Sequence, residues 1–132
     1  MKQDMDGLLS MSDEIWEQSI LPSLSNFIEI KALSPLFEPD WDKLGELDAT
    51  IDLFCEWVER QELDGLTYSV HRIEDRSPVL LITVEGTGPG EVVFYSHLDK
   101  QRSKPELWSE GLGPLSAVRR GPWLFGRGSI DD

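Results

Sequence analysis

The first half of the chain carries the spacing of apolar residues that is typical of amphipathic helices. From Ser12 onward, apolar side chains recur about every three or four positions as far as Ile28. Pro22 interrupts this run, and it either kinks one helix or lies in the first turn of a second. A cleaner apolar stripe over 42–62 predicts another helix. Residues 1–11 are mostly polar and are expected to form a disordered lead-in.

Beyond residue 65 the period changes to two, which is typical of strands. Residues 66–73, "LTYSVHRI", alternate in polarity, and "SPVLLITVEG" at 77–86 is a near-continuous apolar run expected to be buried on both faces. "EVVFYSHLD" at 91–99 is expected to be a third strand, able to pair antiparallel with 77–86 through a short turn. A loop and a short strand pair should follow. The expected class is α/β or α+β, and the buried strands favour a sheet covered by helices.

The charge and the cysteine content indicate which binding partners and which cellular compartment to expect. The 132 residues carry 25 acidic and 12 basic side chains, a net charge of -13. A chain this acidic is repelled by nucleic-acid backbones and by anionic membrane surfaces. Its single cysteine permits no internal disulfide, and its first residues resemble neither a signal peptide nor a membrane span. A cytoplasmic protein with one domain over 12–132 is expected.

The end of the third predicted strand carries the first candidate chemistry. His97 and Asp99 are two positions apart, so both side chains should lie on one face. A carboxylate there can accept the ring N–H and leave the second ring nitrogen available to a metal. The alternative is a structural histidine beside a solvated aspartate.

The last seven residues, "GRGSIDD", carry the second candidate. The glycines Gly126 and Gly128 permit a positive φ or a close backbone approach. Asp131 would then be held at the end of a strand and turn, and His97 and Asp131 are chemically suitable zinc ligands. The alternatives are a mobile tail and, less favourably, an RNA contact through Arg127.

These segments, taken in order, resemble a known family. "VVFYSHLDKQ", Trp108, "GLGP" and "LFGRGSIDD" look like the N-terminal part of the dinuclear-zinc metallopeptidases and amidohydrolases. That family includes carnosinase-type dipeptidases, aminoacylases and acetylornithine deacetylases. "ALSPLFEPDW" is similar to the loop after the family's first helix, and the resemblance covers nearly all of 12–132.

The resemblance implies a fold and a set of site residues. The fold would be the N-terminal part of an α/β, zinc-exopeptidase-like catalytic domain, truncated, with helices packed on a mixed sheet. His97 matches a zinc ligand, Asp131 matches the carboxylate that bridges two zinc ions, and Asp99 matches the catalytic carboxylate that orients His97. Trp108 matches a scaffold position, as do the glycines of "GRG".

The resemblance also implies an activity. It is metal-dependent, dipeptidase-like hydrolysis of an amide or peptide bond in a small peptide or N-acyl amino acid, with two zinc ions or other divalent metals. Nucleic acids and membranes are not expected partners, and full-length relatives are expected to be homodimers. The general base and remaining ligands match no residue here, so a truncated chain, inactive by itself, is expected. The alternative is a non-catalytic binding or regulatory module on the same scaffold.

Two other reactive side chains have ordinary structural interpretations. His71 falls on the polar face of its predicted strand, where an exposed structural histidine is expected. Cys55 lies on the apolar stripe of the second helix, where a packing thiol is expected rather than a nucleophile.

Overall fold

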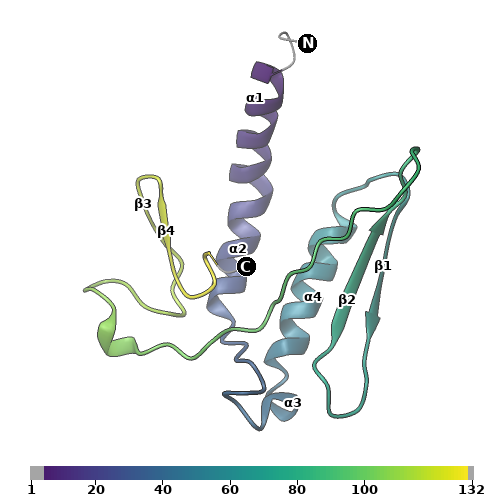
Figure 1. Ribbon diagram of the computed structural model, residues 1–132. Helices are drawn as coiled ribbons and strands as arrows, with labels where there is room; N and C mark the ends of the chain where they lie inside the picture. The colour runs from purple at the N-terminus through teal and green to yellow at the C-terminus, as the bar shows by residue number, and fades with distance from the viewer. Residues whose placement is uncertain (1–4, 131–132) are drawn as a thin grey trace. The chain divides into compact units, whose positions relative to one another are not determined.

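The computed structural model describes residues 5–130 (Figure 1). These residues form two compact units. The first unit is formed by residues 5–29 and 104–129, and the second by residues 30–103 with Ile130. The elements of the first unit are α1 (Met5–Ile15), the π-helical segment η1 (Trp16–Ile20), α2 (Leu21–Glu29), the 3-10 turn η2 (Pro105–Leu107), β3 (Val118–Arg120) and β4 (Trp123–Phe125). The elements of the second unit are α3 (Trp41–Leu44), α4 (Glu46–Glu59), β1 (Leu66–His71) and β2 (Val79–Val84).

The helical path of the first unit begins earlier than the sequence indicates. α1 begins at Met5, inside the predicted lead-in, although none of its residues is buried. Its leucines and methionines are strong helix formers, and α1 continues directly into η1 and α2, so a helix is favoured there without burial. Pro22 lies in the first turn of a second helix, α2, which is one of the two predicted alternatives. The helical path before it widens into η1, where the N–H of Leu21 donates to the carbonyl of Trp16. This wider turn lies next to the proline, whose nitrogen has no hydrogen to donate.

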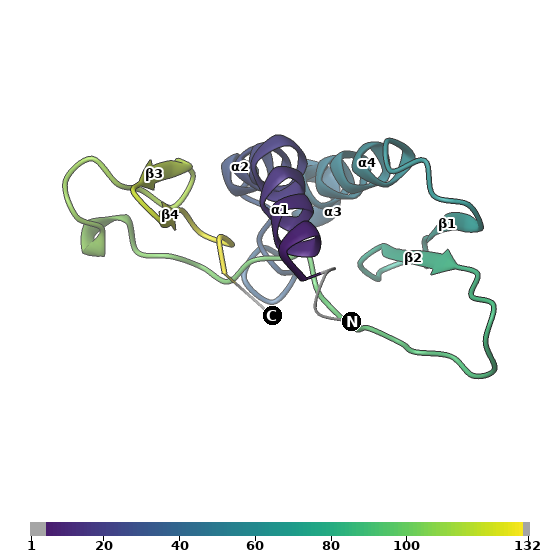
Figure 2. The ribbon, with the colours of Figure 1, turned by 90° about the horizontal axis from the view of Figure 1, so that it is seen from above.

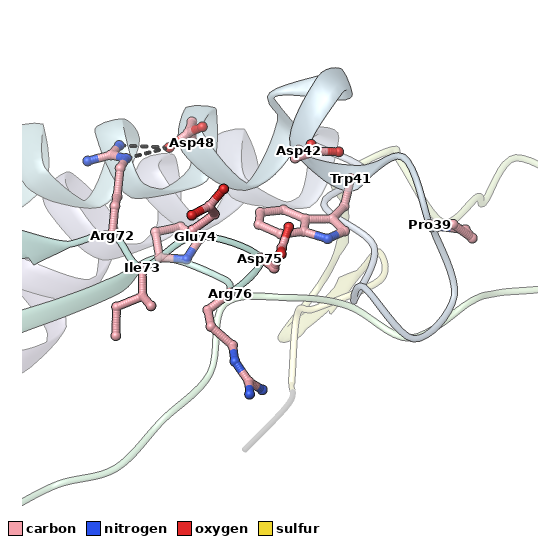
Figure 3. Close-up of a pocket in the computed structure, with 10 residues that line it drawn as sticks. Pro39, Trp41, Asp42, Asp48, Arg72, Ile73, Glu74, Asp75 and Arg76 are labelled. Carbon is pink, nitrogen blue, oxygen red and sulfur yellow. Dashed lines mark hydrogen bonds and ion pairs between the residues drawn. The ribbon is translucent and has the colours of Figure 1, made fainter.

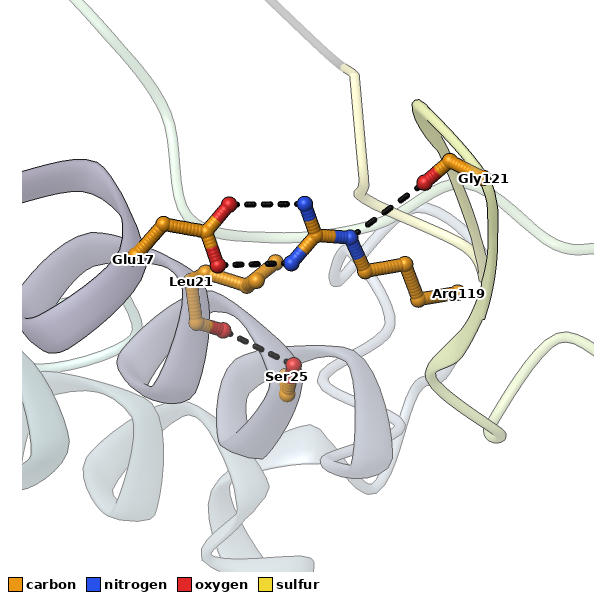
Figure 4. Close-up of polar contacts among 5 residues, drawn as sticks. All are labelled: Glu17, Leu21, Ser25, Arg119 and Gly121. Atoms are coloured by element: carbon orange, nitrogen blue, oxygen red, sulfur yellow. Dashed lines mark hydrogen bonds and ion pairs between the residues drawn. The ribbon is translucent and has the colours of Figure 1, made fainter. Parts of the chain in front are cut away.

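A salt bridge ties the β3–β4 hairpin to this helical path (Figure 4). The Nη1 and Nη2 atoms of Arg119 donate to the two carboxylate oxygens of Glu17, each at 2.6 Å. Nε of Arg119 donates to the carbonyl of Gly121 at 3.3 Å, so the guanidinium is oriented from its own hairpin. The hydrogen bond and charge of Arg119 hold the pKa of Glu17 below its ordinary value of 4.5.

A close approach fixes the residue after β4. Gly126 is buried, has φ +150°, and would place a Cβ only 2.3 Å from Cγ2 of Ile28 in α2. Gly128 also has a positive φ, +89°. Both features predicted for the "GRG" glycines are therefore confirmed, since one backbone lies against a side chain and both residues adopt a positive φ.

The second unit is built on α4 and the β1–β2 hairpin beside it (Figures 1 and 2). The predicted second helix is split into α3 and α4 at Gly45, whose φ of +68° is incompatible with a continuous helix. The buried side chains of α4 lie on one stripe, as expected for an amphipathic helix; they are Leu47, Thr50, Ile51 and Val58.

Two polar contacts join the hairpin to α4. Tyr68 on β1 donates a hydrogen bond to Glu59, which raises the pKa of Tyr68 to about 12. Arg72, just after β1, donates to Oδ1 of Asp48 at 2.7 Å. Both pairs are exposed, so they set the orientation of the hairpin more than its stability.

The predicted third strand does not form, and this prediction was wrong. Residues 91–99 are fully described, and none of them lies in a strand. The apolar side chains over 92–95 are exposed, with Phe94 at 90%. Figure 2 shows this segment running away from the hairpin. The chain instead forms its next bridge at Lys100, which pairs in parallel with Leu33, so the path of the chain takes the segment away from β2.

The burial predicted for 77–86 was also wrong. β2 pairs antiparallel with β1 from Val79 to Val84, but five of its six residues are exposed. The reason is the missing third strand: within residues 5–130, β1 and β2 form a sheet of two strands. A strand in such a sheet has a neighbour on one edge only, so it is covered far less than the centre of a larger sheet.

The described part of the chain thus combines helices with two small antiparallel sheets, a mixed α and β fold. The short strand pair expected near the C-terminal end is confirmed as β3–β4. Among the helices of residues 5–130, none has the length and apolar character needed to cross a membrane.

Gly126→Ala should destabilise the first unit by about 1–3 kcal/mol, because the new methyl group would overlap Ile28 and the backbone φ is unfavourable for alanine. Urea denaturation measures the loss. Gly113→Ala is the matched control, since a Cβ there meets nothing within 4 Å. Equal stabilities of the two variants would contradict the close approach.

Glu17→Gln should weaken the attachment of the β3–β4 hairpin at neutral pH. The folded-state pKa of Glu17 is lowered, so the contribution of its ion pair is present above 4.5 and is lost as the pH falls through the folded value. Hydrogen exchange of the hairpin amides should therefore differ between parent and variant at neutral pH and converge in acid.

Glu14→Gln is the control for this measurement, because the Glu14 carboxylate accepts from the neutral amide of Gln18. The same pH-dependent change in both variants would show that the Arg119 pair does not hold the hairpin.

Candidate functional site

His97 and Asp99 contact each other, as their spacing predicts. Nδ1 of His97 lies 2.8 Å from the backbone carbonyl oxygen of Asp99 and 3.1 Å from its Oδ1. The two side chains are 27% and 30% exposed, so the pair is partly shielded from water but reachable. The segment is extended without being a strand, and an extended backbone is enough to bring positions two apart to one side.

The partners of Nδ1 determine the tautomer of the His97 imidazole. A carbonyl oxygen can only accept a hydrogen bond, and an ionised carboxylate can also only accept. Nδ1 must therefore carry the hydrogen that is shared with Asp99. In the neutral ring this leaves the lone pair on Nε2, the nitrogen through which such a histidine binds a metal.

The other predicted ligand, Asp131, lies outside the described residues. The turn that leads toward it is described as far as Ile130. The N–H of Arg127 donates to the carbonyl of Pro114 at 2.8 Å, and the N–H of Ser129 donates to the carbonyl of Gly126 at 3.2 Å. Trp108 follows η2 and is half-buried. The backbone of the "GRGS" turn is thus held by hydrogen bonds within the first unit.

His71 and Cys55 have the surroundings of structural residues. Nε2 of His71 lies 2.9 Å from the hydroxyl of Ser69, and both are exposed on β1. Cys55 is half-buried on α4. Burial first, and then the charges of Asp52 and Glu59, raise the pKa of the Cys55 thiol. A raised pKa disfavours the thiolate, so the predicted packing role fits the structure.

One pocket of the second unit was not predicted (Figure 3). It encloses about 380 Å³ and is lined by Pro39, Trp41, Asp42, Asp48, Arg72, Ile73, Glu74, Asp75, Arg76 and Pro78. The Arg72–Asp48 ion pair stands in its wall, as the dashed lines in Figure 3 show. Most of the lining comes from "PDWD" and from the charged run "RIEDR", and Asp48 and Pro78 complete it. The proximity of these stretches depends on the placement of the hairpin beside α4. The pocket contains neither His97 nor Asp99.

Metal-binding side chains do not gather elsewhere in the described residues. Within 5–130, no group of three or more His, Cys, Asp or Glu side chains is arranged to hold a metal ion. The imidazole of His97, with Asp99 behind it, is chemically a nitrogen donor of the kind that zinc accepts.

The chain matches no protein-family model and has no significant match among curated proteins.

Proposed function

We propose that the chain contributes part of the metal centre of a zinc-dependent hydrolase of amide or peptide bonds. The observation that carries this proposal is the contact of His97 with Asp99, which directs the imidazole proton to Nδ1 and the lone pair to Nε2. A carboxylate behind a histidine is the arrangement that orients metal ligands and raises their basicity.

The finer fold belongs to the same proposal. We infer a zinc-exopeptidase-like catalytic domain, truncated, because helices precede the strands and because "SHLDK" and "GRGSIDD" occur in the order that the family resemblance requires. The "GRG" turn supports this inference, since Gly126 is buried against Ile28 a few positions before Asp131.

Each residue has a distinct role in the proposal. His97 would bind one zinc ion through Nε2, and Asp131 would bridge that ion and a second one. Asp99 would hold the ring of His97 in orientation. The zinc ions, or other divalent metals, would supply a Lewis acid that polarises the carbonyl of the bond to be cleaved.

The proposed substrates are small peptides or N-acyl amino acids, and the proposed location is the cytoplasm. The location accords with the single cysteine, which forms no disulfide within the chain. A homodimeric full-length assembly is part of the same proposal.

Competitive titration with a chelator should detect zinc binding that depends on His97. His97→Ala removes a donor atom, so zinc affinity should be lost, and Asp131→Asn should reduce it. Asp99→Asn should lower affinity by about tenfold, because it weakens the orientation and basicity of His97 but leaves the donor atom in place.

The matched controls are a histidine and an aspartate that are not assigned as ligands. His71→Ala and Asp132→Asn should leave zinc affinity unchanged, since neither is assigned as a ligand. If His97→Ala binds zinc as tightly as the parent, the metal is held elsewhere and the proposed site is wrong.

The 132-residue chain by itself should not hydrolyse dipeptides or N-acyl amino acids when zinc or cobalt is added. It supplies two assigned ligands, whereas a catalytic zinc ion normally has about three protein ligands. Chromatography of the reaction mixture measures the released amino acid. Turnover that accompanies the purified chain and disappears in His97→Ala would contradict this prediction.

A further inference from the structure

Lys100 is the largest fully buried side chain among the described residues. It is 1% exposed, although it directly follows the half-buried Asp99. Lysine is almost never fully buried unless its amine is paired, because removing the group from water is costly. The Nζ atom donates a hydrogen bond to the backbone carbonyl of Ile30 at 2.5 Å. Burial here therefore coincides with a specific long-range contact.

The backbone of Lys100 makes two further contacts with the same short stretch. Its N–H donates to the carbonyl of Ala32 at 2.7 Å, and its carbonyl accepts from the N–H of Ser34 at 2.9 Å. These bonds form the parallel bridge between Leu33 and Lys100. Lys100 is thus attached to residues 30–34 through its side chain, its N–H and its carbonyl.

One of these contacts controls the partner of His97. The N–H of Lys100 and the carbonyl of Asp99 belong to one peptide unit, which is planar and trans. Fixing the N–H on Ala32 therefore fixes the direction of the Asp99 carbonyl, which points toward Nδ1 of His97 at 2.8 Å. Residues 91–96, before His97, lie in no strand.

We propose that Lys100 is a positioning residue, which sets the tautomer and orientation of His97 through the Asp99–Lys100 peptide. The bond from Nζ to Ile30 holds residue 100 against residues 30–34, and the peptide transmits that position to the His97 ring. The link to zinc rests on the proposed function, whereas the link to the tautomer does not.

The experiment compares Lys100→Met with Lys100→Arg in the full chain. Methionine keeps the length of the side chain and removes the donor, whereas arginine keeps a donor. Long-range nitrogen–proton NMR of the metal-free protein at about pH 8, where imidazole is neutral, reports the tautomer of each histidine. His97→Ala identifies the signals of His97, because His71 is the one other histidine in the sequence.

The parent and Lys100→Arg should show His97 with its hydrogen on Nδ1. Lys100→Met should show averaging of the two tautomers and about tenfold weaker zinc binding, the size of effect typical of residues that orient a ligand. Arg102→Met is the matched control, since Arg102 makes a similar hydrogen bond to the carbonyl of Phe37 but lies beyond the critical peptide. It should leave the His97 tautomer unchanged.

A Lys100→Met protein with the parent's His97 tautomer would overturn the proposal, as would averaging of equal size in Arg102→Met. If Lys100→Met does not fold, a folded Lys100→Arg protein decides, and loss of the Nδ1–H tautomer in it counts against Lys100. Failure of the proposed function has a different signature: zinc binding would then survive His97→Ala while the tautomer still responds to Lys100.

Discussion

The hydrogen bonds between Lys100 and residues 30–34 determine the course of the chain after β2. They form the parallel bridge at Leu33, and the side-chain bond to Ile30 adds a third attachment. Each backbone bond contributes modestly by itself, but a buried N–H or carbonyl left without a partner would cost about 1–3 kcal/mol. The position of residue 100 is therefore strongly specified, and the proposed control of the His97 ring rests on it.

The second unit has an exposed apolar surface. The segment over 91–96 does not extend the β1–β2 hairpin, and side chains such as Phe94 remain in water. β2 is left in a sheet of two strands, where its apolar residues are also exposed. Contiguous exposed apolar residues of this kind are unusual on the surface of a monomeric globular domain.

In the first unit, an ion pair and a close steric contact connect the segment of β3 and β4 with the helices. No residue of α1 is buried. The bidentate pair of Glu17 with Arg119 and the close approach of Gly126 to Ile28 connect the segment of β3 and β4 with η1 and α2. The two contacts differ in physical character. The ion pair is exposed and responds to pH and salt, whereas the glycine contact is a steric requirement that no larger side chain meets.

The sequence by itself determined the features that depend on local spacing. The apolar stripes predicted α2 and α4, and the alternation of polar and apolar residues predicted β1. The glycines of "GRG" predicted a close backbone approach and positive φ angles. The interval of two between His97 and Asp99 was enough to predict their contact, because any extended backbone brings such positions together.

The tertiary structure decided the features that join distant residues. The pairing of Glu17 with Arg119 spans 102 positions, and the bond from Lys100 to Ile30 spans 70. No short sequence pattern predicts either pair. An apolar run such as 77–86 has the same sequence pattern whether or not other elements cover it. Burial and long-range pairing follow from the whole path of the chain, which here includes the bridge between Lys100 and Leu33 and no strand over 91–99.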